Sequence, residues 1–130
     1  MARLTVLLLA LMMATCSWAG AQSSPGVDGV WTGAGVQDNR STWSIRLALD
    51  TANDTYRIDY PSLKCGGRLQ LLRLSAHRLE FTEELTYGLS RCVNGGKLII
   101  TQTGADELSY EWYYPNGKKG AVGILKRAEK

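Results

Sequence analysis

Alternation of apolar and polar residues is the feature that most restricts the fold of this 130-residue chain. In ELSYEWYY, residues 107–114, apolar or aromatic side chains occupy every second position from Leu108 to Tyr114. The same period recurs in STWSIRLALD (41–50), TYRIDY (55–60), RLQLL (68–72) and, with both faces apolar, GKLIITQT (96–103). A period of two is typical of strands, and no window after residue 21 has the spacing of an amphipathic helix. We therefore expect an all-β domain with little helix.

Turn-forming residues separate these segments. The candidate turns are DTAND (50–54), SAH (75–77), TGAD (103–106) and PNG (115–117), and Asn-Gly is the strongest hairpin signal among them. The spacing of the turns indicates about eight short antiparallel strands. A meander of this length leaves bare edges unless it closes on itself or folds into two layers. The sequence therefore predicts an antiparallel up-and-down β-barrel.

The start of the chain has the pattern of a secretory signal peptide. Arg3 precedes an apolar run over residues 4–14, and the small residues Ala19 and Ala21 form a cleavage site. The run is too short to span a bilayer comfortably. The alternatives are a retained anchor and a lipoprotein acylated at Cys16. We predict a signal peptide at 1–21, one barrel domain at 22–130, and a periplasmic or secreted protein without an integral membrane span.

Cys65 and Cys92 are the cysteines that remain after residue 21. In an oxidising compartment such a pair is expected to form a disulfide, which stabilises a loop of this length by about 3–4 kcal/mol. The alternatives are two free thiols or part of a metal site, but His77 is the only histidine and a zinc site needs about four ligands. Both cysteines precede a glycine pair, in KCGGR and CVNGGK. We expect two loops joined at one end of the barrel, with Gly66 and Gly67 adopting backbone angles open to glycine.

Glu83 lies at an unusual place in its strand. It shares the parity of Leu79, Phe81, Leu85 and Tyr87, which puts a carboxylate on the apolar face. A buried carboxylate has to be paired, hydrogen-bonded or protonated. Three interpretations follow: an ion pair or tyrosine network that fixes the strand register, a polar anchor inside a ligand pocket, or a β-bulge that turns Glu83 outward.

Enzyme motifs are missing from the sequence. His77 falls in a turn, no serine lies in a G-x-S-x-G motif, and the glycines at 33–35 precede no helical pattern. Glu83 and Glu84 are expected on opposite faces of one strand. The net charge of +3 is too small to indicate nucleic acid. We predict a non-enzymatic protein with no catalytic residue, no metal site, no cofactor and no nucleic-acid partner.

Arginines recur at outward positions of successive strands, namely Arg46, Arg57, Arg68, Arg73 and Arg78. They are interleaved with Asp59 and Glu80. This pattern favours a solvated face of salt bridges over a site for an anionic partner.

Two distant segments carry a family resemblance. Gly29-Val30-Trp31 opens the first expected strand, and GILKR, ending at Arg127, closes the last. The pair resembles the pattern of the calycins, the lipocalin- and avidin-type barrels, in which a Gly-x-Trp meets an arginine that packs over the indole. The resemblance implies structural roles for Gly29, Trp31 and Arg127.

The segments WSIRLAL, YRIDYPSLKCGG and LTYGLSRC also resemble a poorly characterised family of small exported bacterial domains. This second resemblance implies a barrel and a bacterial source, and it brings no assigned activity. The chain is shorter than a lipocalin and lacks the long loop usual there. Nine aromatic residues are expected to face inward, which favours a filled interior: Trp31, Trp43, Tyr56, Tyr60, Phe81, Tyr87, Tyr110, Trp112 and Tyr114.

Two functional hypotheses remain. The first is recognition of a macromolecule, most simply a protein of the cell envelope, by an inhibitor or immunity-type protein. Its candidate surface is the disulfide-linked end (Ser62, Leu63, Lys64, Leu89, Arg91 and Asn94), with Tyr113, Lys118 and Lys119 as a second patch. The rival is a carrier or sensor of a small apolar or aromatic ligand, with Trp43, Tyr60, Glu83 and Trp112 lining a pocket. A cavity above roughly 300 Å³ that touches Glu83 would favour the rival. The third class of function is a structural module with no dedicated ligand.

Overall fold

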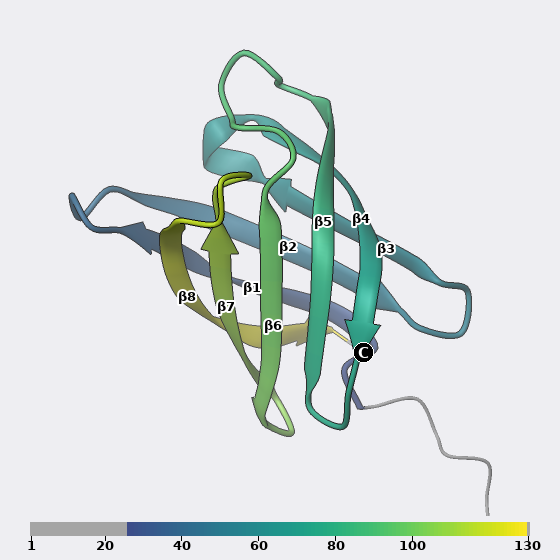
Figure 1. Ribbon diagram of the computed structural model, residues 1–130. Helices are drawn as coiled ribbons and strands as arrows, with labels where there is room; N and C mark the ends of the chain where they lie inside the picture. Colours follow the sequence, from purple (N-terminus) through teal and green to yellow (C-terminus); the bar gives the residue numbers. More distant parts are fainter. Residues whose placement is uncertain (1–25, 130) are drawn as a thin grey trace, which may run out of the picture.

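The computed structural model describes residues 26–129, and the predicted signal peptide lies outside them. Eight antiparallel strands form one closed barrel in chain order, in which β8 returns to pair with β1 (Figure 1). The strands are β1 (Gly29–Gln37), β2 (Thr42–Asp50), β3 (Thr55–Tyr60), β4 (Cys65–Leu74), β5 (Arg78–Tyr87), β6 (Lys97–Gly104), β7 (Glu107–Tyr113) and β8 (Lys119–Glu129). A 3₁₀ turn, η1 (Pro61–Leu63), separates β3 from β4. The predicted all-β barrel is confirmed.

Alternation along the strands builds the core. In β7 the side chains of Leu108, Tyr110 and Trp112 are buried, while Ser109 and Glu111 between them are partly exposed. Each strand contributes an inward row of this kind, because successive side chains point to opposite faces of a sheet.

None of the helical segments within residues 26–129 is long and apolar enough to cross a membrane.

The barrel has two distinct ends, which we name by what they contain. The closed end comprises residues 26–28 and the connections 51–54, 75–77 and 105–106. The open end comprises the connection 38–41, η1 with Lys64, the loop 88–96 and the connection 114–118, and it lies toward the top and left of Figure 1.

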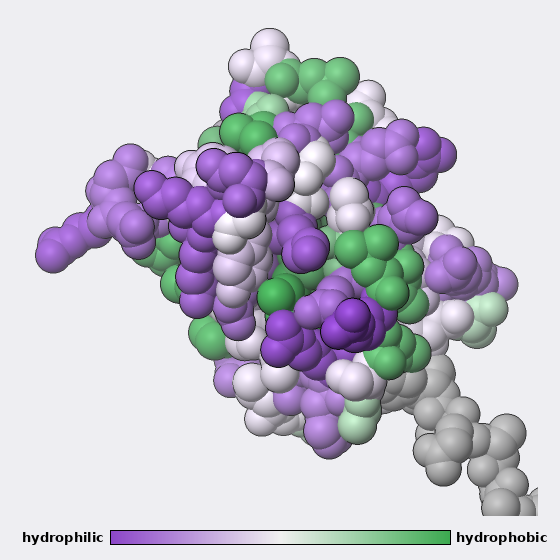
Figure 2. All heavy atoms as spheres, viewed as in Figure 1, coloured by the Kyte–Doolittle hydropathy of each residue, from purple (hydrophilic) through white to green (hydrophobic). Residues whose placement is uncertain are grey.

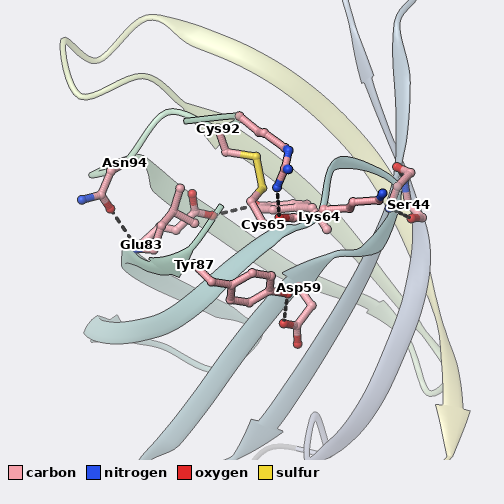
Figure 3. The surroundings of a disulfide bond; sticks show 12 residues. Ser44, Asp59, Lys64, Cys65, Glu83, Tyr87, Cys92 and Asn94 are labelled. Atoms are coloured by element: carbon pink, nitrogen blue, oxygen red, sulfur yellow. Dashed lines mark hydrogen bonds between the residues drawn. A yellow bond between two sulfur atoms is a disulfide. The ribbon is translucent and has the colours of Figure 1, made fainter. Parts of the chain in front are cut away.

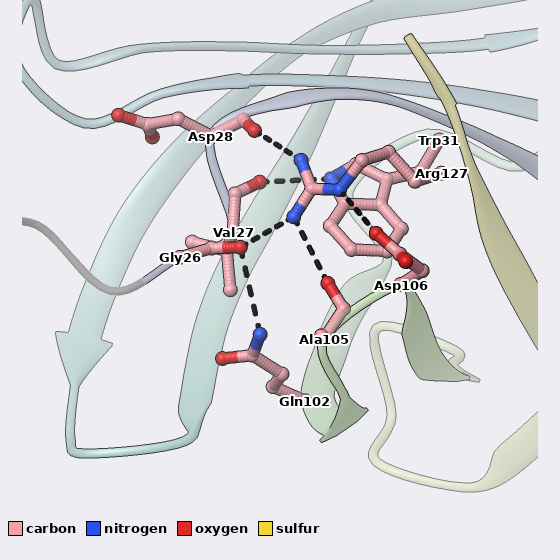
Figure 4. Close-up of polar contacts among 8 residues, drawn as sticks. All are labelled: Gly26, Val27, Asp28, Trp31, Gln102, Ala105, Asp106 and Arg127. Carbon is pink, nitrogen blue, oxygen red and sulfur yellow. Dashed lines mark hydrogen bonds and ion pairs between the residues drawn. The ribbon is translucent and has the colours of Figure 1, made fainter. Parts of the chain in front are cut away.

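The closed end is sealed by Trp31 and Arg127, which are paired in the register between β1 and β8. Trp31 is fully buried, its indole N–H donates to the carbonyl oxygen of Val27 (2.8 Å), and the guanidinium carbon of Arg127 lies 4.2 Å from the centre of an indole ring (Figure 4). Arg127 also pairs with Asp106 (3.0 Å). Further acceptors of the guanidinium are the carbonyl oxygens of Gly26, Asp28 and Ala105.

This arrangement is the contact that the calycin-like pattern implied, and each of the three guanidinium nitrogens donates at least one hydrogen bond. Gly29, the glycine of the Gly-x-Trp segment, has φ 125°, a backbone conformation that favours glycine.

Tyr87 corrects the expectation for the inner face. The register between β4 and β5 pairs Gly66 with Tyr87 but Gly67 with Leu85, so Thr86 is an extra residue in β5. Such a bulge shifts the alternation by one position. Tyr87 is therefore 40% exposed, and its hydroxyl donates to the outward carboxylate of Asp59 (2.6 Å).

The glycine pair after Cys65 serves a different purpose from the one expected. The residue with a left-handed conformation is Lys64 (φ 56°), and neither Gly66 nor Gly67 has a positive φ. A Cβ atom on Gly67 would instead lie 2.0 Å from the carbonyl oxygen of Glu84. The absence of a side chain allows β4 and β5 to approach closely at the bulge.

Candidate ligand pocket at the open end

A pocket of about 260 Å³ enters the barrel from the open end. Trp43, Tyr60, Glu83, Tyr110 and Trp112 line it from the strands. The remaining lining residues are Gln37, Ser41, Thr42, Leu63, Arg91, Cys92, Val93 and Tyr114. The predicted filled interior is therefore present only in part, because aromatic side chains surround a space at this end.

Glu83 is the charged residue at the inner part of the pocket. It is 2% exposed, which confirms its inward direction and contradicts the bulge that would have turned it outward. The hydroxyl of Tyr60 donates to Glu83 Oε2 (2.6 Å) and lies 2.9 Å from the hydroxyl of Tyr110. Because the Tyr60 proton is used by the carboxylate, Tyr110 is the donor in the second bond. The result is a chain of hydrogen bonds that ends on Glu83.

Burial raises the pKa of Glu83 to about 7, although hydrogen bonds from Tyr60 and Trp112 act in the opposite direction. Loss of solvation disfavours the charged form of a carboxyl group. Burial also raises the pKa of Tyr60 well above its usual value, with the charges of Tyr110 and Glu83 adding to the effect. Glu83 is thus a buried group whose charge changes near neutral pH, while Tyr60 and Tyr110 stay protonated.

Two indole rings form part of the wall. The N–H of Trp43 is buried and makes no hydrogen bond of normal geometry. Burial raises the pKa of the nearby Tyr110 hydroxyl, and the proximity of the Trp43 N–H opposes this rise slightly. The Trp112 ring packs against Gly96, where a Cβ atom would lie 2.4 Å from the indole nitrogen. A side chain larger than hydrogen at position 96 would therefore push Trp112 into the pocket.

The predicted disulfide is present and forms part of the rim. Cys65 and Cys92 are bonded, with Cα atoms 6.4 Å apart, and Cys92 lines the pocket (Figure 3). The backbone of Glu83 makes hydrogen bonds with Gly95 and Gly96, and the Asn94 side chain accepts from the N–H of Leu85 (2.8 Å). The loop 88–96 is therefore tied to β5 beside the buried carboxylate.

The residues proposed for a protein partner surround the mouth of the pocket. Leu89 is 57% exposed, Lys64 is exposed, and Leu63 packs against the core and lines the pocket. Arg91 lines the pocket too, and its guanidinium donates to the carbonyl oxygen of Lys64 (3.4 Å). Ser62 is engaged with Ser44 through two backbone-to-hydroxyl bonds of 2.9 Å.

The second predicted patch lies at the same end of the barrel, in the hairpin of β7 and β8. Tyr113 faces outward, and its hydroxyl donates to Glu111 (2.6 Å), which also pairs with Lys119 (3.2 Å). Lys118 is exposed in the connection. The structure thus brings the two predicted protein-binding regions to one end of the barrel, but the hydroxyl of Tyr113 has an intramolecular partner.

The outer wall carries the expected ion pairs. Arg57 pairs with Asp59 (3.1 Å), Arg68 with Glu84 (2.8 Å), and Arg73 and Arg78 both with Glu80 (3.6 and 3.2 Å). On the face seen in Figure 2, hydrophobic residues form small patches between hydrophilic ones. Within residues 26–129, no cluster of three or more His, Cys, Asp or Glu side chains could hold a metal ion.

Sequence reasoning did not assign Tyr110 to the polar site. The signal available was its position two residues before Trp112, on the same face of the strand. Its hydroxyl became part of the site only because Tyr60, 50 positions earlier, lies opposite it across the barrel.

No protein-family model matches the chain, and no curated protein matches it. Solved structures share its fold. A redesigned β-barrel, mFAP1, bound to DFHBI, has a TM-score of 0.59 and 16% identity, covering 78% of this chain and 95% of that one. A second redesigned β-barrel, b11L5F_LGL, has a TM-score of 0.56 and 11% identity over 80% and 93% of the two chains. EF1p2_mFAP2b bound to DFHBI has a TM-score of 0.56 and 12% identity over 78% and 94%.

These similarities define the class of the protein: a small closed eight-stranded antiparallel β-barrel of lipocalin-like architecture. The resemblance to a family of exported bacterial domains stays a prediction.

Proposed function

We propose that this protein binds a small organic molecule in the pocket at the open end and is not an enzyme. The observation that carries the proposal is a pocket lined by a buried carboxyl group, two indoles and two tyrosine hydroxyls that form hydrogen bonds with one another and with the carboxyl group. Ligand sites are typically concave and mostly apolar, with a few polar groups that fix orientation. The volume of about 260 Å³ is slightly below the 300 Å³ expected for a carrier, which favours a compact ligand.

The barrels of similar fold that are bound to DFHBI support this choice, since they show that the architecture is compatible with a bound compound. We further propose that the protein acts in the periplasm or outside the cell. A disulfide between Cys65 and Cys92 fits an oxidising compartment, and the pattern of residues 1–21 fits export.

The second candidate function is recognition of a protein partner in the cell envelope, as by an inhibitor. The observation that favours it is the exposure of Leu89 and Val93, 57% and 46%, in a loop held by the disulfide. A rigid loop with exposed apolar side chains loses little entropy when it binds. The two functions predict different effects of mutation, because Leu89 does not line the pocket.

The test is an NMR titration of the ¹⁵N-labelled protein with three probes of similar shape, benzylammonium, benzyl alcohol and benzoate. We expect at least one probe to shift the indole N–H signals of Trp43 and Trp112. The Trp31 signal is the internal control, because that indole is sealed in the closed end. The proposal is contradicted if all three probes leave Trp43 and Trp112 unchanged up to their solubility limits.

A further inference from the structure

The charge of Glu83 has no balancing partner in the described part of the chain. Its carboxylate accepts a hydrogen bond from Tyr60 and lies near the indole N–H of Trp112, but no lysine, arginine or histidine of residues 26–129 forms an ion pair with it. A buried carboxylate without a cation is unfavourable unless it is protonated or a cation is supplied. The pocket gives a cation from solution access to this position.

The walls of the pocket suit a positive charge. Trp43, Trp112, Tyr60, Tyr110 and Tyr114 line it together with Glu83. The electron-rich faces of such rings attract ammonium groups, and aromatic enclosures are a common means of binding organic cations. The same rings offer apolar surface to the rest of a ligand.

An anionic ligand fits less well. The cation on the pocket lining is Arg91, whose guanidinium is exposed and directed to the carbonyl oxygen of Lys64. An anion held there would remain at the mouth, and one that entered further would meet Glu83. Repulsion between the two negative charges would require Glu83 to take up a proton.

We propose that the pocket selects a small organic cation, a protonated amine or quaternary ammonium group on an apolar body, with its charge against Glu83 and its body between Trp43 and Trp112. This inference rests on the proposed function and names the ligand class for that site.

The ionisation of Glu83 gives the binding a dependence on pH. The titratable groups packed around Glu83 are Tyr60 from β3 and Tyr110 from β7, and Trp112 adds an N–H. β4 presents Leu69 at the paired position, and Arg91 is the charged residue of the loop 88–96 on the lining. Since the pKa of Glu83 is raised to about 7, a cation must displace its proton below that pH. Affinity for a cation should fall about tenfold between about pH 8 and about pH 6.

The experiment compares the Kd values of benzylammonium and benzyl alcohol, measured by NMR titration of the folded protein. At about pH 8 we expect benzylammonium to bind about 10- to 100-fold more tightly, as for a hydrogen bond to a charged group. The preference should shrink at about pH 6, while the affinity of the neutral alcohol should stay constant.

Two variants locate the effect. Glu83→Gln keeps the size and hydrogen-bonding capacity of the side chain and should abolish the preference for the cation while retaining benzyl alcohol binding. Glu84→Gln removes a carboxylate from the outer face of the same strand, where it pairs with Arg68, and should leave the preference unchanged. Circular dichroism confirms that both variants fold.

The outcomes separate the two proposals. Equal binding of the cation and the alcohol, stronger binding of benzoate, or an unchanged preference in Glu83→Gln would overturn the cation assignment while leaving a ligand pocket in place. Failure of every probe to shift Trp43 and Trp112 would overturn both.

Discussion

The two ends of the barrel both contain an indole and a charged side chain, but one end is sealed and the other holds a pocket. At the closed end, the indole N–H of Trp31 and the guanidinium of Arg127 have partners within the chain, and the Trp31 side chain is fully buried. At the open end, the indole N–H of Trp43 lacks a hydrogen bond and Glu83 lacks a cation beside a pocket of about 260 Å³. Satisfied polar groups stabilise a fold, whereas unsatisfied ones next to a cavity mark a place where a ligand can complete them.

The largest loss of stability is expected from a substitution at the closed end. Trp31→Ala removes a fully buried side chain and the ring beneath Arg127, so it should lower the free energy of unfolding by about 3–5 kcal/mol. Trp43→Ala at the open end should cost less, because that ring is partly exposed and adjoins an existing cavity. Urea denaturation of both variants measures the difference. A larger loss in Trp43→Ala would show that the ends do not differ in this way.

Removal of the disulfide tests the open end next. A variant carrying Cys65→Ala and Cys92→Ala should lose about 3–4 kcal/mol, because the unfolded chain regains the freedom of a 27-residue loop. The indole signals of Trp43 and Trp112 should broaden or shift, whereas that of Trp31 should remain. Equal perturbation of all three signals would mean that the disulfide supports the whole barrel.

The pH dependence of stability should be dominated by the open end. Burial raises the pKa of Glu83 from 4.5 to about 7, so between these values the folded state holds more protons than the unfolded state. Stability then falls as pH rises, and the Glu83 contribution should decrease by about 2–3 kcal/mol between about pH 5 and about pH 8.

Urea denaturation at several pH values measures this slope. Glu83→Gln should remove the decrease, and Glu84→Gln should retain it. If wild type and Glu83→Gln showed the same slope, the carboxyl group would not titrate in the predicted range.

The smallest effect should come from the wall between the ends. Arg68 and Glu84 form an ion pair with both side chains more than half exposed, and Glu84→Gln should change stability by about 0.5 kcal/mol or less. Thermal unfolding in low and high salt checks this value. A loss of stability as large as that caused by removing the disulfide would show that the ion pairs of the outer wall contribute substantially to the free energy of unfolding.

The fold and the inward direction of Glu83 were accessible from the sequence because they depend on alternation, which is local. Tyr87 was misplaced because one additional residue, Thr86, reverses the parity, and the bulge is visible only against Gly66 and Gly67 on the neighbouring strand.

The pocket could be predicted from the sequence only in part. Alternation shows which side chains face inward, but not their height along the barrel. Glu83, Tyr60 and Tyr110 meet because the registers of several strands bring positions 23 and 50 residues apart to one level. Arg91 was assigned to a protein-binding surface for the same reason, since nothing local shows that it also borders the cavity.

Closure of the sheet also limits how any second chain can associate with this one. Each of the eight strands already has two neighbours, so the described barrel has no edge strand. Association by β-augmentation, in which a peptide adds a strand to the edge of a sheet, therefore has no full-length edge to extend. Recognition of a protein partner is expected to depend mainly on side chains and loop geometry.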